Sequence, residues 1–177
     1  METLQRLTRR QLEALRFIAA HAPEGRGLGL NAIADGLRVR APSALGHLGP
    51  LEELGLIARY RGKSRVTDRG LACLGEYLRH HRVAESLFAR AGLSADATHL
   101  AALEVDLALS HRTVQEICEA EGHPTVCPHG EPIAPCEPSS PKKADRRGGH
   151  SSHARGPRSS SRGGVEPGPL PEFPHLA

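Results

Sequence analysis

Apolar residues recur at helical spacing in the first part of the chain. The pattern predicts a helix over residues 8–22 that begins at Thr8, a suitable N-cap residue. Its apolar face consists of Leu12, Leu15, Ile18 and Ala19. After a stretch rich in proline and glycine, residues 31–37 predict a short second helix that begins at Asn31. Ile33, Ala34 and Leu37 would face the core.

A third helix is predicted over residues 43–54. Its apolar positions are Leu45, Leu48, Leu51 and Leu54. The opposite side is therefore expected to face outward, and it carries Ser43, Ala44, Gly46 and His47. Glycine and proline destabilise helix interiors by about 1 and 3 kcal/mol. Gly49 and Pro50 thus predict a kink or a break near Gly49.

A basic hairpin is predicted directly after this helix. Gly55 suits the C′ position, and residues 56–67 predict two short strands around Gly62-Lys63. Its cations are Arg59, Arg61, Lys63 and Arg65. Helix, helix, turn, helix and hairpin follow one another as in a winged helix-turn-helix, in which one helix enters a groove of double-stranded DNA and cations bind phosphates. The alternative is a protein-interaction module with a solvated basic edge.

Residues 71–136 predict a second, helical domain. A long helix is expected over residues 68–91, and on it His81 and Glu85 lie four residues apart on one face, a spacing that can hold a metal. Residues 95–109 predict an unusually apolar helix, which suits a dimer interface, and Ser110 would cap a last helix. In a two-fold dimer, the groove-binding helices would lie about 34 Å apart. The predicted fold is mainly α, with domains at 1–70 and 71–136.

Composition changes the picture only after residue 136. Residues 137–177 are rich in Ser, Gly, Pro and Arg without periodicity, so we expect a disordered tail. Its cations would either add a sequence-independent attraction to DNA or serve only solubility. The net charge of +3 does not decide between these roles.

Other signals narrow the class of protein. No run of 18 apolar residues and no signal peptide is found, so we expect a cytoplasmic protein without a membrane partner. In a reducing compartment, Cys73, Cys118, Cys127 and Cys136 are expected to be thiols or metal ligands rather than disulfides. Motifs for nucleophilic catalysis, phosphate binding and dinucleotide binding are missing, so an enzyme is not expected.

Six short motifs carry a family resemblance. They are Ala41-Pro-Ser-Ala, Leu51-Glu-Glu-Leu-Gly-Leu-Ile, Tyr60-Arg-Gly, Val66-Thr-Asp-Arg-Gly, His80-His-Arg-Val-Ala-Glu and Cys127-Pro-His-Gly-Glu-Pro-Ile. In this order the chain resembles, over residues 7–135, the metal-dependent repressors of the diphtheria toxin repressor and manganese transport regulator type. The resemblance implies a winged helix, a helical dimerisation and metal-sensing domain, and Mn²⁺ or Fe²⁺ as co-repressor. It implies a homodimer on operator DNA.

The resemblance also implies two metal sites, of which one has its expected ligands in this sequence and the other does not. His81, Glu85 and His99 match the ligands of the family's ancillary site; the alternative is an exposed helix pair with His99 as a helix cap. For the regulatory site, the dimerisation helix offers Leu103, Asp106 and Leu107, and the first helix offers Arg10 and Glu13. Two leucines and an arginine do not bind a cation, so this site is expected to be lost or rebuilt. Arg10 is expected to pair with Asp106 or Glu13 as a permanent ionic link.

A further group of soft donors follows the last predicted helix. It comprises Cys118, His123, Cys127, His129 and Cys136, which would favour zinc. The spacing has no paired Cys-x-x-Cys, and in the family the segment from Cys127 is a linker. The sequence therefore predicts a dimeric, DNA-binding transcriptional regulator with a partly degraded metal sensor. The alternative is a degenerate member that acts as a metal-independent protein-interaction or metal-buffering module.

Overall fold

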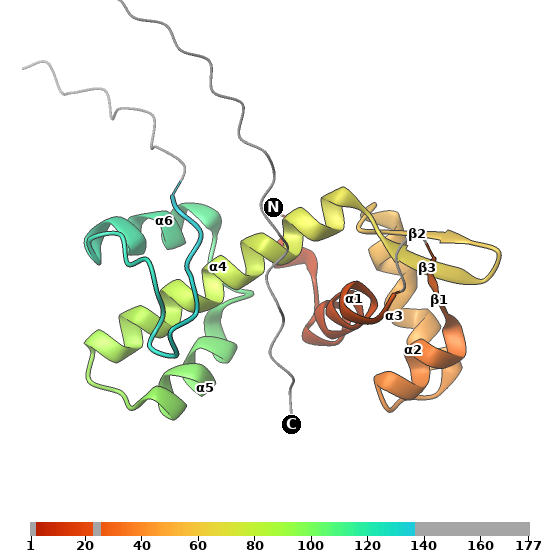
Figure 1. Ribbon diagram of the computed structural model, residues 1–177, viewed down its shortest axis with the longest axis horizontal. Helices are drawn as coiled ribbons and strands as arrows, with labels where there is room; N and C mark the ends of the chain where they lie inside the picture. Colours follow the sequence, from red (N-terminus) through yellow and green to blue (C-terminus); the bar gives the residue numbers. More distant parts are fainter. Residues whose placement is uncertain (1–2, 23–25, 137–177) are drawn as a thin grey trace, which may run out of the picture. The chain divides into compact units, whose positions relative to one another are not determined.

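The computed structural model describes residues 3–22 and 26–136 (Figure 1). The elements are a 3₁₀ turn η1 (Leu4–Arg6), α1 (Arg9–His21), β1 (Leu28–Gly29), α2 (Leu30–Gly36), α3 (Ala41–Glu53), β2 (Ile57–Tyr60), β3 (Lys63–Val66), α4 (Asp68–Arg90), α5 (Ala95–Val105) and α6 (His111–Ala120). The mainly helical fold with a small sheet confirms the predicted winged-helix class. The predicted tail, residues 137–177, lies outside the described residues.

The start of α1 is as predicted. The Thr8 hydroxyl accepts a hydrogen bond from the Gln11 N–H at 3.3 Å, and the Gln11 side-chain oxygen accepts one from the Thr8 N–H at 2.8 Å. This reciprocal capping box satisfies two amides that the first turn leaves free. Leu12, Leu15 and Ile18 then reach the core.

The predicted start of the second helix at Asn31 is wrong. Helix α2 begins at Leu30 with Gly29 as its N-cap residue, and Asn31 is exposed. The cause is the two-residue strand β1, in which Leu28 pairs with Ser64 and Gly29 with Lys63. The chain passes directly from this strand into α2, so no residue separates them.

Helix α3 differs from its prediction in its first residue, in having no break, and in which of its side chains are buried. It begins at Ala41, two residues early, because Pro42 is tolerated in a first turn where amides lack partners. No break occurs near Gly49. Pro50 lies inside the helix, and the carbonyl that it leaves without an amide partner belongs to the exposed residue Gly46. Ala44 is fully buried, whereas Leu45 is 41% exposed.

The hairpin turn lies one residue earlier than predicted. The sheet is antiparallel with strand order β1-β3-β2, and Tyr60 faces Lys63 across the turn. The two turn residues are Arg61 and Gly62, with φ values of 49° and 75°. Positive φ at both positions defines a type I′ turn, whose twist suits a hairpin. Lys63 is therefore the first residue of β3 and not a turn residue.

Helix α4 runs from the hairpin into the helical part of the chain. Thr67 caps it by accepting the Gly70 N–H at 3.1 Å, and a Cβ on Gly70 would lie 2.1 Å from the Leu56 carbonyl oxygen. Only glycine fits this close approach. Helix α4 contacts α1, β3, α5 and α6, and the described residues 3–22 and 26–136 belong to one compact unit. The predicted domain boundary after residue 70 lies within the first turn of α4.

The remaining elements are close to expectation. Helix α5 ends at Val105, four residues before the predicted end, and Ser110 caps α6 as predicted. A small core cluster packs α4 and α6 against the segment that follows α6; its buried members are Val83, Val114, Cys118, Cys127 and Ile133. Within the described ranges, none of the helices has the length and apolar character needed to cross a bilayer.

Candidate metal centre and nucleic-acid interface

Three donors converge where α4 packs against α5. His81 and Glu85 lie one turn apart on α4, with 3.0 Å between His81 Nε2 and Glu85 Oε1. His99 Nδ1, from α5, lies 3.1 Å from each of these two atoms. The structure thus brings together the three residues that the sequence suggested as ligands, and Glu85 is buried rather than part of an exposed helix pair.

A fourth donor comes from the segment after α6. His129 Nδ1 lies 3.3 Å from Glu85 Oε1, and the Cys127 thiol also hydrogen-bonds to Glu85. Sequence analysis grouped His129 and Cys127 with other soft donors and missed their approach to Glu85, which lies more than 40 residues earlier. The available signal was the Cys-x-His spacing of the Cys127-Pro-His motif.

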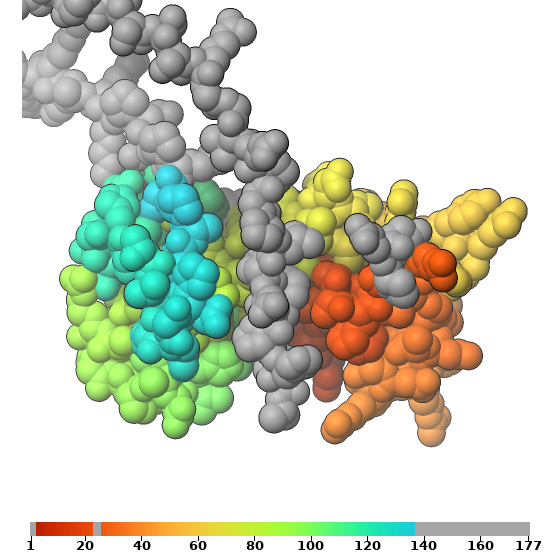
Figure 2. All heavy atoms as spheres, in the orientation of Figure 1, coloured from red at the N-terminus to blue at the C-terminus, as the bar shows by residue number. Residues whose placement is uncertain are grey.

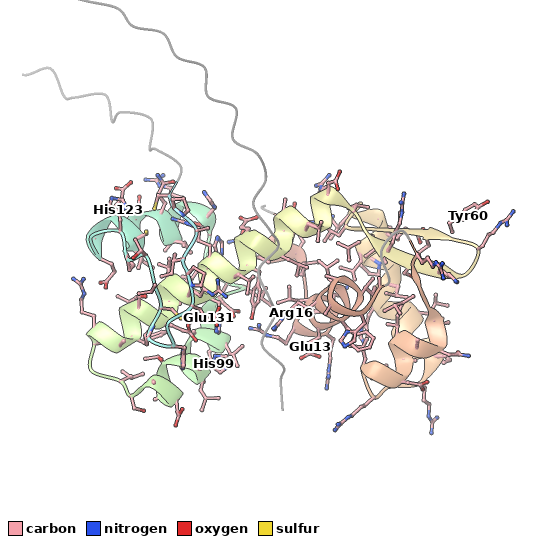
Figure 3. The ribbon with its side chains drawn as sticks, viewed as in Figure 1. Glu13, Arg16, Tyr60, His99, His123 and Glu131 are labelled. Carbon is pink, nitrogen blue, oxygen red and sulfur yellow. The ribbon has the colours of Figure 1, made fainter. Side chains whose placement is uncertain are left out.

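The segment that carries His129 is fixed by its backbone and by α4. The Cys127 N–H donates to the Glu131 carbonyl at 2.9 Å. Arg82 of α4 donates to the Pro132 carbonyl and forms an ion pair with Glu131 at 3.0 Å. Figure 3 labels His99 and Glu131, which lie on α5 and on this segment. His129 is therefore held near Glu85 by groups outside the centre.

Two of the four candidate ligands are buried and two are partly exposed to solvent. His81 and Glu85 are buried, whereas the side chains of His99 and His129 are 40% and 35% exposed. Burial alone would raise the pKa of Glu85, but hydrogen bonds and charge from His81, with the hydrogen bond from His99, lower it to about 2. Glu85 is therefore a carboxylate at neutral pH, ready to bind a cation.

Asp106 fixes the orientation of His81. The fully buried Asp106 carboxylate lies 2.9 Å from His81 Nδ1 and accepts a hydrogen bond from it, while Nε2 faces Glu85 and His99. Burial would raise the pKa of Asp106, but hydrogen bonds from His81 and Arg9 outweigh it and lower the pKa. A carboxylate behind the distal ring nitrogen is the usual support of a metal-binding histidine.

Asp106 also holds the first helix. Arg9 of α1 forms an ion pair with Asp106 at 2.6 Å and donates to the Leu103 carbonyl. The predicted pairing of Arg10 with Asp106 is wrong. Arg10 lies on the solvent side of α1 and forms the other expected pair, with Glu13 at 2.8 Å. Asp106 and Glu13, the two remaining acids of the expected regulatory site, are thus each paired with an arginine.

The donor set fits a divalent transition metal. Two ligands bound at about 2.1 Å and at right angles are about 3 Å apart, close to the separations among the donor atoms of His81, Glu85 and His99 and to that between His129 Nδ1 and Glu85 Oε1. Three imidazoles and one carboxylate suit manganese, iron, cobalt or zinc. When bound, such an ion would supply positive charge, and its ligands would connect α4, α5 and the segment after α6.

The outer face of α3 forms a second candidate surface. Ser43 and Gly46 are exposed and His47 is half-buried, so these three predicted groove-facing residues can meet a partner. Ala44 cannot, because α3 starts two residues early and Ala44 packs inward with Leu48 and Leu51. Sequence analysis missed Arg38 and Arg40, which are exposed at the N-terminal end of α3 and were assigned only to a turn.

The hairpin presents most of its predicted cations to solvent. Arg61, Lys63 and Arg65 are exposed, and the Arg61 guanidinium lies 5.3 Å from the centre of the Tyr60 ring. Arg59 is half-buried and lies 3.5 Å from Glu52 on α3, so its charge is partly satisfied. Figure 2 shows the hairpin projecting from its surroundings, and Figure 3 shows Tyr60 at its outer end.

Fold and site together define a winged helix-turn-helix protein whose helical second half contains a candidate metal centre. Residues 67–135 match the family model described as iron dependent repressor, metal binding and dimerisation domain. The match identifies residues 67–135 as the domain of the metal-dependent repressors, which are transcriptional regulators. The resemblance noted in the sequence is thereby confirmed.

Individual relatives agree with this assignment. An uncharacterized HTH-type transcriptional regulator of Aeropyrum pernix is 35% identical over 71 residues, which are 40% of this chain and 39% of that protein. The chain thus spans about two fifths of this curated relative. The hypothetical protein SSo2273 from Sulfolobus solfataricus has a TM-score of 0.69 at 26% identity, covering 72% of this chain and 99% of that chain. A manganese-dependent transcriptional repressor in complex with manganese has a TM-score of 0.55 at 27% identity, covering 74% and 63%.

Proposed function

We propose that this protein is a dimeric repressor that binds promoter DNA through its winged helix and senses Mn²⁺ or Fe²⁺ at His81, Glu85, His99 and His129. One observation carries the metal assignment. Asp106 accepts a hydrogen bond from His81 Nδ1, while Nε2 faces the other donors, 3.0 Å from Glu85 Oε1. Metal-binding histidines usually have a carboxylate or carbonyl oxygen on their other ring nitrogen in this way.

The same residue links the metal centre to the DNA-binding half. Asp106 contacts His81 on one side and Arg9 of α1 on the other. Helix α1 packs against α3, the helix that we propose to enter the major groove. A metal that fixes the His81 ring would therefore also fix the carboxylate that holds α1, and binding at the centre would favour one placement of the winged helix.

Dimerisation is supported by the surface of α5. Leu100 is 64% exposed on this helix, and Leu93 just before it is 38% exposed. The matched family domain is described as a dimerisation domain. A two-fold pairing through α5 would place two α3 helices on successive turns of the major groove, about 34 Å apart.

On DNA, α3 and the hairpin have different tasks. Ser43, Gly46 and His47 would face the major groove, where base edges carry sequence information. Arg61, Lys63 and Arg65 would bind phosphates, together with Arg38 and Arg40. These contacts set affinity and position but not base identity.

The direct test is DNA binding by metal-free and metal-loaded protein. Fluorescence anisotropy would follow the chelator-treated protein on its own upstream DNA while Mn²⁺ or Fe²⁺ is added at fixed salt, with scrambled DNA as competitor. We expect binding that prefers the upstream sequence and tightens with metal. Equal affinity for both DNA sequences would exclude specific repression.

A second function is favoured by the Arg9–Asp106 pair. This ion pair occupies the region of the expected regulatory site without any metal. It would keep α1 docked at all metal concentrations, and the protein would then bind DNA, or another protein, independently of metal. In the same titration, specific binding that is indifferent to metal would favour this alternative.

Charge reversal in the hairpin gives a separate prediction. The variant Arg61→Glu/Lys63→Glu should weaken binding to every DNA sequence and reduce the slope of log K against log salt by about 2, roughly one unit for each lost phosphate contact. The salt titration is measured by anisotropy. Arg112→Glu, an exposed residue of α6, serves as the control with an unchanged slope. An unchanged slope in the hairpin variant would remove the hairpin from the interface.

A further inference from the structure

A second group of soft donors lies at the end of α6. Cys118 is in the last turns of this helix, His123 follows it, and Cys136 arrives from the segment that carries His129. The two sulfur atoms are 3.0 Å apart, and Cys118 Sγ is 3.9 Å from His123 Nδ1. The three donor atoms all lie within 4.8 Å of one another.

The end of α6 places His123 beside Cys118. Gly122 has a φ of 74°, and the His123 N–H returns to the Cys118 carbonyl at 2.9 Å, the 6→1 bond of a Schellman motif. His123 itself has a φ of 59°, a conformation that side-chain-bearing residues seldom adopt. The chain therefore accepts local strain at the position that brings an imidazole back toward the thiol.

Arg79 of α4 fixes the third donor. Its Nε donates to the Ala134 carbonyl at 3.3 Å, and its Nη2 lies 2.7 Å from Cys136 Sγ. Cys136 is thus held near Cys118 by a residue outside the candidate site.

We propose that Cys118, His123 and Cys136 bind Zn²⁺, with water as the fourth ligand. Two thiolates and one imidazole are a donor set that zinc prefers. Binding releases two thiol protons to solvent and leaves the two sulfur charges balanced by the ion. Tetrahedral zinc with bonds of about 2.3 Å places two sulfur atoms about 3.8 Å apart. Cys136, which is only partly buried, would move outward by about 0.8 Å.

This site would be separate from the centre at Glu85. Its ligands do not include Glu85, Cys127 or His129, and Figure 3 shows His123 well apart from His99. Zinc here would join the end of α6 to residue 136, and so close the segment of chain between them. That segment contains His129, so this zinc would have a structural role in holding a ligand of the first centre.

The test separates the two centres by mutation. In full-length protein carrying Glu85→Gln/His129→Gln, zinc binding is measured by competition with a chromophoric chelator under reducing conditions. We expect one tightly bound zinc per chain. In this background His123→Asn should lower zinc affinity by about 100-fold or more, because Asn accepts the positive φ but is a poor zinc ligand. His21→Asn, at an exposed position on α1, is the matched control with unchanged affinity.

Sulfur ligation has its own readout. Co²⁺ in place of Zn²⁺ should give a sulfur-to-cobalt charge-transfer band that Cys136→Ser and Cys136→His both reduce, because one of the two thiolates is lost, and that Cys73→Ser leaves intact. Absence of tight zinc in the Glu85→Gln/His129→Gln protein would overturn the proposal. Zinc affinity unaffected by His123→Asn would do the same, and this exposed substitution decides the matter even if Cys136→Ser fails to fold. Isolation of a Cys118–Cys136 disulfide whose reduced form binds no zinc would also overturn it.

Discussion

Arg9→Ala should lower the free energy of unfolding by about 3 kcal/mol in chelator-treated protein. Asp106 is fully buried, and Arg9 supplies the positive charge beside it. Removing one partner of a buried ion pair leaves an uncompensated charge, at a typical cost of about 3–5 kcal/mol. The lower end applies here because the Arg9 side chain is 33% exposed and His81 still hydrogen-bonds to Asp106. Urea unfolding gives the measurement.

The neighbouring arginine provides a matched control. Arg10 pairs with Glu13 three residues later on α1, and its side chain is 64% exposed. An exposed pair of this kind contributes about 0.5 kcal/mol or less. Arg10→Ala should therefore leave stability nearly unchanged. Equal effects of the two substitutions would mean that the Arg9–Asp106 pair does not hold α1 to the helical half.

A double-mutant cycle separates this pair from general packing. Asp106→Asn keeps the shape of the side chain and removes its charge. If the ion pair accounts for the loss in Arg9→Ala, the double variant Arg9→Ala/Asp106→Asn should be less destabilised than the sum of the two single variants. Strict additivity would assign the loss to packing of the arginine stem instead.

Local signals in the sequence were sufficient for the starts of two helices. Thr8 and Ser110 each precede a helical pattern, and each caps its helix in the structure. A cap depends on hydrogen bonds within three residues, so the sequence contains nearly all of the information. His81 and Glu85 were predictable as a pair for the same reason, because helical spacing alone places them on one face.

The missed features depend on contacts between distant segments. Strand β1 has two residues and exists only because β3 lies beside it. The facing of α3 depends on packing: the small Ala44 is buried and Leu45 is exposed, the reverse of what a hydrophobic pattern predicts. Hydrophobic periodicity contains no information on side-chain size, and so it does not predict that a small side chain allows a close helix contact.

The candidate metal centre shows the same division. His81, Glu85 and His99 were identified through helical spacing and family resemblance, whereas His129 reaches Glu85 only through the fold of the segment after α6. The pairing of Asp106 with Arg9 rather than Arg10 depends on the rotation of α1. Adjacent helical residues differ by about 100° in direction, so one residue decides which arginine faces inward.

Glu85→Gln should lower Mn²⁺ affinity by at least about 100-fold. Loss of a supporting group around a metal typically costs 10–100-fold, and Glu85 is the central carboxylate of the candidate ligand set. Its pKa of about 2 means that the wild-type residue brings a full negative charge at neutral pH. Glutamine keeps the size of the side chain but replaces that charge with a neutral amide. Mn²⁺ is the suitable probe because it prefers oxygen and nitrogen donors to thiolates.

Thermal or urea unfolding with added Mn²⁺ makes this loss visible. At a concentration of 100 times the wild-type Kd, ligand binding stabilises the folded protein by about 2.7 kcal/mol. At that concentration a variant with 100-fold weaker binding gains only about 0.4 kcal/mol. Glu104→Gln makes the same chemical change at an exposed position of α5 and should retain the full gain. If Glu85→Gln also retains it, Mn²⁺ binds elsewhere, and the geometry at His81, His99 and His129 serves packing rather than sensing.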